Sequence, residues 1–516
     1  MSYILPNTEI KILSGVTLDN SYNNTVYFSC RSAQQAYFSG KVRYSLSAQS
    51  YQRISSEKIR VEKSMDELLN CNYIMIKNSS HENFYVYGFI MNVEYVNEGV
   101  SEITYEIDVM QTYFYDCTLL PCYVEREHSV TDAIGENILP EGLDTGEYVY
   151  NNYGDLIGQD LAIIVGIVDV NENPLLQDVG TSGQIYEGIY GALTLYAFLH
   201  NDYAGVNAII NNYIQRPEAI VTIYTAPKQL INQLINPVVS GGVKLKNSES
   251  TNYFYAYMPK IGSGMSLNGY VPKNKKLYTY PYSFYSIDNG CGENLIYRTE
   301  FHTGQDAQYP LFITGTILQP CEMVLKPVNY KGAGIYHAEN LSISSYPICG
   351  WNVDSYQSWI SQNALPTAIK IGGGIVSSAS AGTFSANNLL SEVVNLATSN
   401  YTQSIKADVC KGSLKTGNAM ASGKFLTYHY GWCSVQKNYA ESIDNFFSRF
   451  GYATRKVKTP NISSRPSWNY VKTAGCIVKG DFNKKVTDKI QTIFDNGITF
   501  WKNGDRIGYY GDANEV

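Results

Sequence analysis

Alternating apolar and polar residues give the clearest signal in the chain, between residues 84 and 113. Successive side chains of an extended strand point to opposite faces, so residues two apart share a face. In the second half of this segment the apolar face comprises Ile103, Tyr105, Ile107 and Val109. Turn residues at positions 97 to 99 separate the two halves, so the pattern predicts a β-hairpin.

The polar face of the predicted hairpin is acidic. It carries Glu94 in the first half and Glu102, Glu106 and Asp108 in the second half. One interpretation is an ordinary solvated sheet surface. The other is a wall that must not bind a polyanion, because like charges repel each other.

Residues 150 to 350 alternate short apolar runs with turns rich in Gly and Asn. The runs at residues 161 to 168 and 219 to 224 predict strands. Between them, residues 203 to 216 have helical spacing and stop before Pro217. The apolar positions of this predicted helix are Val206, Ile209, Ile210 and Ile214. The middle of the chain is therefore predicted to be α+β.

Residues 371 to 405 contain a single charged residue, Glu392. The first part, IGGGIVSSASAGTFSANNLLS, is too mixed for a lone spanning helix and too apolar for an ordinary solvated loop. The second part has an apolar helical face formed by Leu389, Leu390, Val393, Val394, Ala397 and Tyr401. Two interpretations are open: a helix docked on the body behind a flexible lead-in, or a concealed segment that contacts lipid.

The last hundred residues return to sharp periodic patterns. Helical spacing predicts one helix that ends near Gly451 and a second that ends at Asn496 and Gly497. Their apolar positions are Ile443, Phe446, Phe447 and Phe450 in the first, and Val486, Ile490, Ile493 and Phe494 in the second. Residues 468 to 480 between them are predicted to form a strand.

The same region contains a basic stretch, with nine basic and two acidic residues from Arg455 to Lys489. The basic residues are Arg455, Lys456, Lys458, Arg465, Lys472, Lys479, Lys484, Lys485 and Lys489. Three interpretations are open: a complement to an acidic neighbouring subunit, a solvated face, or a DNA contact.

Composition indicates the fold class and bears on whether the chain binds DNA. The chain has 516 residues, enough for about three domains. Apolar residues make up 44% and charged residues 16%, which is typical of a globular protein. The 45 Tyr and 42 Gly favour strands and turns, so the predicted class is mainly β with α+β parts. A net charge of −7 disfavours tight DNA binding.

The amino terminus and the cysteines indicate a reducing compartment. The first residues lack the basic and apolar regions of a signal peptide. The ten cysteines are scattered and form no CxxC motif. We therefore expect reduced, mostly buried thiols in a chain made in cytoplasm.

A search for chemical motifs predicts no catalytic, cofactor-binding or metal-binding residues. The six histidines form neither HxH nor HExxH, and no GxSxG elbow occurs. The nearest approach to a phosphate-binding loop, from Gly417 to Lys424, has the wrong spacing and lacks the following Ser or Thr. Glycoside-cleaving carboxylate pairs have no sequence signature that selects two acids here. We predict that the protein is not an enzyme and needs no cofactor.

Five strings in order resemble the tail-knob, or distal tail-tube, proteins of small short-tailed bacteriophages with protein-primed linear genomes. They are NYIMIKN (72 to 78), EYVNEGVSEITYEIDVMQTY (94 to 113) followed by VEREH (124 to 128), NKKLYTYPY (274 to 282), YPICGWNVDSYQSWISQN (346 to 363) and QTIFDNGITFW (491 to 501). None of them is a catalytic motif. The resemblance covers most of the chain.

This resemblance implies a homohexameric β-tube in the virion tail, assembled in the host cytoplasm. It implies tube-wall domains at residues 1–155 and 416–516, outer α+β domains at 156–350, and an apolar membrane-active loop region at 351–415. The implied partners are collar or connector proteins of the phage, double-stranded DNA in transit, the host membrane and host cell-wall glycan. The alternative is a tail-associated protein that binds cell-wall glycan or degrades peptidoglycan.

Two residue sets receive roles from the resemblance. The loop that plugs the tube and then penetrates the membrane would use Ile371, Gly372, Gly373, Gly374, Ile375, Val376, Phe384, Leu389, Leu390, Val393 and Val394. The tube lumen would be lined by Glu94, Glu102, Glu106 and Asp108, whose charges let DNA slide past.

Overall fold

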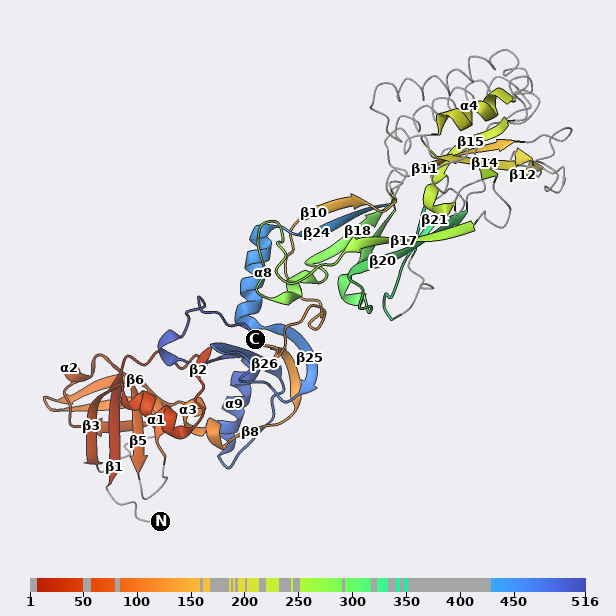
Figure 1. The fold of residues 1–516 in the computed structure, drawn as a ribbon. Helices are drawn as coiled ribbons and strands as arrows, with labels where there is room; N and C mark the ends of the chain where they lie inside the picture. Colours follow the sequence, from red (N-terminus) through yellow and green to blue (C-terminus); the bar gives the residue numbers. More distant parts are fainter. Residues whose placement is uncertain are drawn as a thin grey trace, which may run out of the picture. The chain divides into compact units, whose positions relative to one another are not determined.

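A computed structural model provides the structure of the chain (Figure 1). It describes residues 7–49, 57–78, 84–157, 161–167, 185–186, 189–190, 194–199, 202–212, 220–231, 243–244, 251–289, 293–316, 323–332, 340–343, 348–350 and 428–516. The chain divides into two compact units. Unit 1 comprises Met1–Gly146, Gly269–Leu277 and Gln436–Val516, and unit 2 comprises Glu147–Asn268 and Tyr278–Val435. Both ends of the chain therefore contribute to unit 1.

The first part of unit 1 is an antiparallel sheet, which we call the N-terminal sheet. Its strands lie in the order β3, β1, β5, β6, β7, β4 among the described residues. The elements of this part are β1 (Thr8–Ser14), β2 (Asn24–Val26), α1 (Arg31–Ser39), β3 (Val42–Gln49), β4 (Lys58–Val61), α2 (Met65–Leu68), β5 (Cys71–Asn78), β6 (Val86–Asn97), β7 (Val100–Ile107), α3 (Val109–Tyr113), η1 (Phe114–Asp116), β8 (Thr118–Leu119) and β9 (Cys122–Glu127).

The centre of this sheet is buried on both faces. On β5, Ile74 and Ile76 join one apolar cluster, while Tyr73 and Met75 join another. A strand covered on both sides needs an unbroken apolar run, which residues 73 to 76 supply. The N-terminal sheet is therefore the structural centre of the first part of unit 1.

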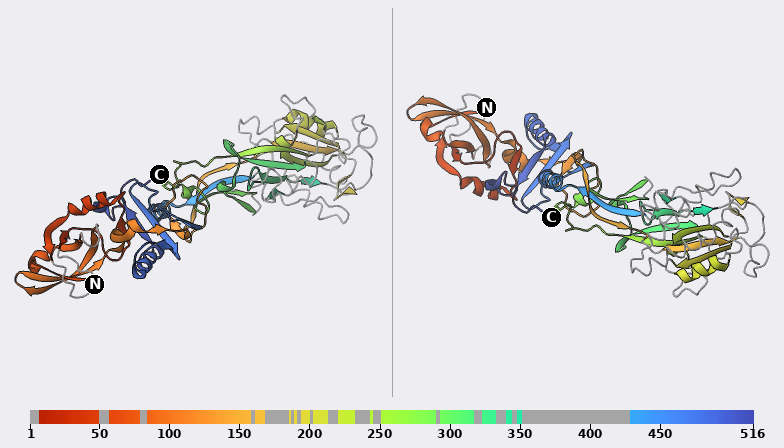
Figure 2. Two further views of the ribbon diagram at one scale, coloured as in Figure 1. Left: turned by 90° about the horizontal axis from the view of Figure 1, so that it is seen from below. Right: turned by 90° about the horizontal axis from the view of Figure 1, so that it is seen from above.

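The second part of unit 1 joins the two ends of the chain in one sheet, the C-terminal sheet. Its strands lie in the order β2, β28, β26, β9, β25, with β2 parallel to β28. The elements from the end of the chain are α8 (Lys437–Phe450), β25 (Tyr452–Lys458), β26 (Trp468–Ala474), β27 (Val478–Lys479), α9 (Lys484–Asn496), β28 (Ile498–Trp501) and η8 (Gly504–Arg506). Figure 2 shows the C-terminal strands (blue) beside the N-terminal strand β9 (orange).

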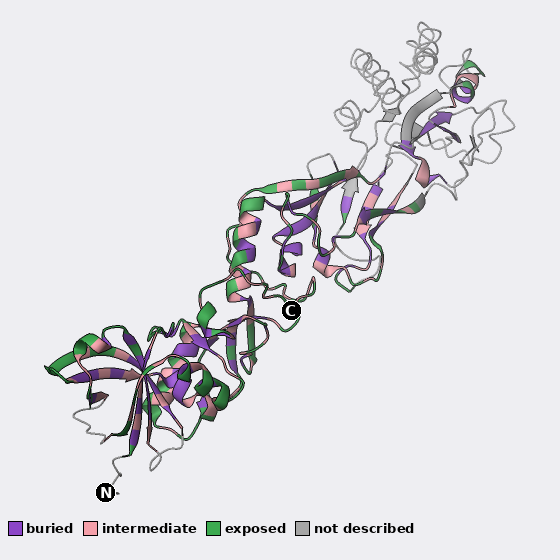
Figure 3. Cartoon of the chain, turned by 60° about the vertical axis from the view of Figure 1, so that its left-hand side comes forward, coloured by how far each residue is buried: buried purple, intermediate pink, exposed green. Residues whose placement is uncertain are grey.

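Several predicted elements are confirmed. The hairpin consists of β6 and β7, α8 ends at Gly451, and α9 ends at Asn496. The strand predicted over residues 468 to 480 divides into β26 and β27, because Gly475 adopts a φ of 67° and turns the chain. On α9, Ile490, Ile493 and Phe494 are buried as the helical spacing predicts, and Figure 3 colours the described residues by burial.

Unit 2 is built from further antiparallel sheets. Their strand orders among the described residues are β10-β24-β18-β19, β16-β14-β11-β15-β23, β17-β20-β21-β22 and β12-β13. The elements are β10 (Tyr148–Asp155), β11 (Leu161–Ile167), β12 (Ile185–Tyr186), β13 (Ile189–Tyr190), β14 (Thr194–Leu199), α4 (Tyr203–Asn212), β15 (Ile220–Pro227), η4 (Lys228–Leu230), β16 (Val243–Lys244), β17 (Thr251–Pro259), β18 (Ser283–Asp288), β19 (Asn294–Tyr297), η7 (Thr299–Phe301), β20 (Gln308–Thr316), β21 (Met323–Pro327), β22 (Leu341–Ile343), β23 (Ile348–Gly350) and β24 (His429–Val435), with η6 (Lys275–Tyr278) where unit 1 meets unit 2 along the chain.

The two units divide the chain differently from the ranges predicted from sequence. β10 pairs antiparallel with β24, so that Tyr148 lies opposite Val435 and Asp155 lies opposite His429. β24 also pairs with β18 from the middle of the chain. Both strands lie in unit 2, whereas the ranges 1–155 and 416–516 predicted from the sequence include them.

Tyrosine rings cover glycines on the paired strands β10 and β24. The ring of Tyr430 lies where a Cβ atom on Gly154 would stand, and the ring of Tyr150 occupies the corresponding space at Gly431. Glycine in a strand has no side chain to pack, and an aromatic ring from the neighbouring strand fills that gap. These contacts give one physical reason for an excess of both Tyr and Gly.

Candidate functional surfaces

The acidic face of the β6–β7 hairpin is paired with basic residues of the same chain. Glu102 lies directly opposite Glu94. The neighbouring strand β4 places Lys58 Nζ 3.1 Å from Glu102 and 3.8 Å from Glu94, and Arg60 Nε 3.2 Å from Glu102. The Lys58 hydrogen bond, assisted by Arg60, lowers the pKa of Glu102 despite its burial. The face is therefore of mixed charge, with the Glu94 side chain 52% exposed.

Glu106 is paired with a residue from the other end of the chain. Its carboxylate lies 2.5 Å from Lys489 Nζ of α9 and accepts a hydrogen bond from Asn20 Nδ2 at 3.0 Å. Burial alone would raise the pKa of Glu106, but these two hydrogen bonds outweigh it and the pKa is lowered. Glu106 therefore remains charged at neutral pH.

The structure differs from the predicted pattern at Asp108. β7 ends at Ile107, and Asp108 is the N-cap of α3, where its carboxylate accepts from the backbone N–H groups of Met110 and Gln111. Tyr73 Oη also donates to it, at 2.8 Å. Asp108 is only 2% exposed, and burial raises its pKa to about 6. Asp108 therefore does not lie with Glu102 and Glu106 on the polar side of β7, because its side chain caps α3.

The sequence did not predict that Lys58, Arg60 and Lys489 pair with the acidic face. A signal was present for Lys58 and Arg60, because residues 58 to 61 alternate basic and apolar side chains. That pattern is typical of a strand with one basic face. Lys489 had no such signal, because its partner Glu106 is distant in sequence and only folding brings the two together.

The C-terminal basic stretch is also partly neutralised within unit 1. Lys458 pairs with Glu127, Lys472 lies 3.0 Å from Glu125, and Lys489 pairs with Glu106. Arg465 is buried and donates to the backbone carbonyl of Asn514. The remaining basic residues of the stretch are exposed: Arg455, Lys456, Lys479, Lys484 and Lys485.

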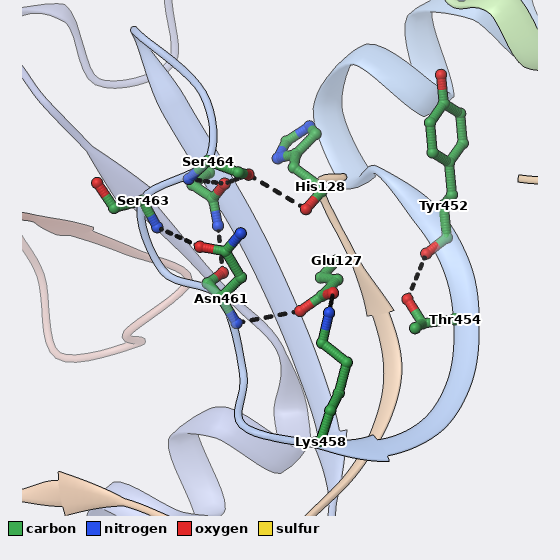
Figure 4. A network of polar contacts seen from close by, with 9 residues as sticks. Glu127, His128, Tyr452, Thr454, Lys458, Asn461, Ser463 and Ser464 are labelled. Atoms are coloured by element: carbon green, nitrogen blue, oxygen red, sulfur yellow. Dashed lines mark hydrogen bonds and ion pairs between the residues drawn. The ribbon is translucent and has the colours of Figure 1, made fainter. Parts of the chain in front are cut away.

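A network of polar contacts fixes the connection from β25 to β26 against β9 (Figure 4). Glu127 accepts from Lys458 and from the backbone N–H of Asn461. Ser464 Oγ donates to the backbone carbonyl of His128 at 3.1 Å. These contacts hold a loop from the end of the chain against a strand from its first third, so they stabilise the joint between the two ends.

His128 lies in this network as a neutral side chain. Its Nδ1 accepts from the backbone N–H of Tyr470 at 2.8 Å, so Nε2 carries the proton and donates to the Ser448 carbonyl at 3.1 Å. Burial, with the nearby Arg465 charge, lowers the pKa of His128 to about 3. A second ring proton has no acceptor left within this arrangement.

We expect acid to destabilise the protein through His128. Between pH 6.5 and about 3 the unfolded chain binds a proton that the folded chain excludes, so stability falls as pH falls. The free energy of unfolding should drop by about 2 kcal/mol from pH 6.5 to pH 5, at ~1.4 kcal/mol per unit. Urea denaturation at several pH values gives the free energy of unfolding of the wild type and of His128→Asn. The difference between the two slopes of this free energy against pH measures the contribution of His128. Equal slopes would contradict it.

Unit 2 displays exposed tyrosines on one edge strand. Tyr253, Tyr255 and Tyr257 alternate along β17 and are 57%, 40% and 52% exposed. Tyr253 and Tyr255 contact the ring of Phe312 on β20, with centroids 5.2 and 5.7 Å apart. These exposed rings account for three of the 45 tyrosines of the chain.

The predicted membrane-active residues, from Ile371 to Val394, lie outside the described residues. Among the residues that the structure does describe, no helix is both long and apolar enough to cross a bilayer. In the same part of the chain, no group of three or more His, Cys, Asp or Glu is arranged to hold a metal ion. The described cysteines that are free include Cys71, Cys122, Cys433 and Cys476, all buried.

Comparison with known proteins shows similarity over the whole chain. The tail knob protein gp9 of Bacillus phage B103 is 26% identical, and that of Bacillus phage phi29 is 24% identical, each over 100% of both chains. The structure of the bacteriophage C1 tail knob protein, gp12, matches with a TM-score of 0.61 at 16% identity, covering 97% of this chain and 98% of the other. That match shows a shared fold.

Two family models also match. The first, described as Caudoviral major tail protein N-terminus, covers residues 6–118. The second, described as the C-terminal domain of the Bacillus phage phi29 tail knob protein gp9, covers residues 243–515, more than half of the chain. The relatives are named as tail knob proteins and not as enzymes, which agrees with the prediction of no enzymatic activity. The chain therefore belongs to the tail knob protein family of short-tailed bacteriophages and is a structural component of the phage tail.

Proposed function

We propose that six copies of the chain close into a tube that conducts DNA during ejection, and that residues 371 to 401 then engage the host membrane. The observation that carries this proposal is the full-length similarity to tail knob proteins, with 100% of both chains aligned. In this proposal the tube assembles in the host cytoplasm and is joined to the collar or connector proteins of the virion.

The open edges of the N-terminal sheet support an assembly of copies. Among the described residues, β3 and β4 are the outermost strands of this sheet. An exposed strand edge presents unpaired N–H and C=O groups that favour pairing with another strand. A closed ring of identical subunits covers such edges without leaving any free at the ends.

The β6–β7 hairpin is the proposed lumen wall. The Glu94 side chain is the exposed acidic group of this wall. The pKa values of Glu102 and Glu106 are lowered, so both carboxylates stay ionised at neutral pH. The pairing of Glu102 with Lys58 and Arg60 fixes these side chains and weakens the net field. A wall of this kind repels DNA only weakly and offers it no basic groove to bind. Asp108 has no part in it, because its carboxylate caps α3 and accepts from Tyr73 Oη inside unit 1.

Deleting residues 371 to 401 from the protein in intact phage tests the membrane step. The proposal expects particles that assemble, adsorb and show a hollow tail tip in images, but whose DNA delivery into cells falls to background. A variant in which the same residues are replaced by a Gly-Ser linker of equal length controls for chain connectivity, and it should fail in the same way. Normal infection by either variant would contradict the membrane role, and a tail tip without a channel would contradict the tube.

A further inference from the structure

We propose that Cys122 and Cys476 form a redox pair that closes as a disulfide when the protein passes from the reducing host cytoplasm into an oxidising medium. The two residues come from opposite ends of the chain, at the start of β9 and just after β26. Both are 4% exposed and belong to the same apolar cluster of unit 1.

The strand register brings the two cysteines together. β26 runs antiparallel to β9, and Ala474 lies opposite Tyr123 at the end of the ladder. Gly475 then turns the chain with a φ of 67°. After the turn the two segments stay paired, because the Leu120 N–H donates to the Ile477 carbonyl at 2.9 Å and Val478 lies opposite Leu119. Cys122 and Cys476 therefore lie between two paired positions of neighbouring segments, within one apolar cluster.

Asp495 of α9 holds the turn that presents Cys476. Its carboxylate accepts from Thr473 Oγ1 at 2.7 Å, from the Gly475 N–H at 3.2 Å and from the Cys476 N–H at 3.0 Å. One carboxylate therefore fixes both backbone N–H groups of the turn that presents the Cys476 thiol.

The same surroundings keep the thiols reduced inside the cell. Burial raises the pKa of the Cys476 thiol to about 12 and also raises that of Cys122. A thiol reacts as its thiolate, so these two thiols react slowly with oxidants while the surrounding structure stays folded. A local opening gives access, because β27 pairs with β8 through only two residues, Val478 and Lys479, and Ile477 is 46% exposed.

The reaction balances with a small disulfide such as oxidised glutathione as the oxidant. The Cys476 thiolate attacks one glutathione sulfur, forms a mixed disulfide and releases the first glutathione thiolate. The Cys122 thiolate then attacks the Cys476 sulfur and releases the second. Two protein thiols are oxidised by two electrons, and their protons pass to the two glutathione molecules.

The test maps disulfides in extracellular virions and in the purified protein treated with oxidised glutathione, after alkylation of free thiols. Mass spectrometry should find a linked Cys122–Cys476 peptide in both, and oxidation should raise the thermal midpoint of the purified wild type. Cys122→Ser and Cys476→Ser should lose the linked peptide and the rise in the midpoint.

The matched control is Cys71→Ser, which removes a buried thiol from the other apolar cluster. This variant should keep both the linked peptide and the rise. Modification of the exposed Cys30 shows that the oxidant is active. Alkylated, unlinked Cys122 and Cys476 in virions, or in purified wild type whose Cys30 is modified, would overturn the proposal.

Discussion

Gly451→Ala is expected to destabilise the protein by at least about 4 kcal/mol, because two costs combine at one position. Gly451 follows α8 with a φ of 64° and a ψ of −154°, a region that essentially only glycine occupies. A Cβ atom there would also stand closer than 3.0 Å to the backbone of Glu127 and His128. The backbone of β9 cannot move away freely, because it pairs with both β25 and β26.

Gly475→Ala is the matched control for this variant. Gly475 has a similar φ of 67°, but a Cβ atom there meets nothing within 4 Å. Only the backbone strain remains, which costs about 1–2 kcal/mol. Urea denaturation of both purified variants measures the difference. If Gly451→Ala loses no more stability than Gly475→Ala, the backbone contact with β9 is not the cause.

Asp444→Ala is expected to cost about 3–5 kcal/mol, because it removes the acceptor for several buried donors. Asp444 is 1% exposed on α8. Its carboxylate accepts from Tyr270 Oη at 2.7 Å and from the backbone N–H groups of Lys273 and Asn274 at 2.8 and 2.9 Å. These donors lie in residues 269–277, the segment by which the chain returns to unit 1. Without the carboxylate, this segment should detach from α8.

Urea denaturation measures the loss of stability, and hydrogen exchange in residues 269–277 shows whether the segment detaches. Glu441→Ala, one turn earlier on α8, is the control because Glu441 is partly exposed and its ion pair with Lys437 is 3.9 Å long. An exposed pair of this kind contributes less than about 1 kcal/mol. A similar loss of stability in the two variants would contradict the role of Asp444, as would unchanged exchange in the segment.

Local patterns predicted much of the secondary structure of unit 1. The β6–β7 hairpin follows from alternation with a period of two, and the ends of α8 and α9 follow from glycines after apolar helical runs. The resemblance of short strings also identified the family correctly. Such signals depend on residues near each other in the chain, so the sequence alone carries them.

The candidate site was less predictable, since its chemistry depends on distant partners. Alternation placed Asp108 with Glu102 and Glu106, but the chain turns into α3 and buries Asp108 as a cap. The charges of Glu102 and Glu106 were visible in the sequence, whereas their pairing with Lys58 and Lys489 was not. No local pattern reports which remote cation a carboxylate will meet.

The sequence by itself determined the mainly β character, the principal helices and hairpin of unit 1, and the family, because each rests on local periodicity or on short strings. The tertiary structure alone decided that β10 and β24 belong to unit 2, that the acidic face is paired, and that Cys122 and Cys476 share one apolar cluster. These outcomes depend on strand register between segments far apart in the chain, and register is set by how whole faces pack together.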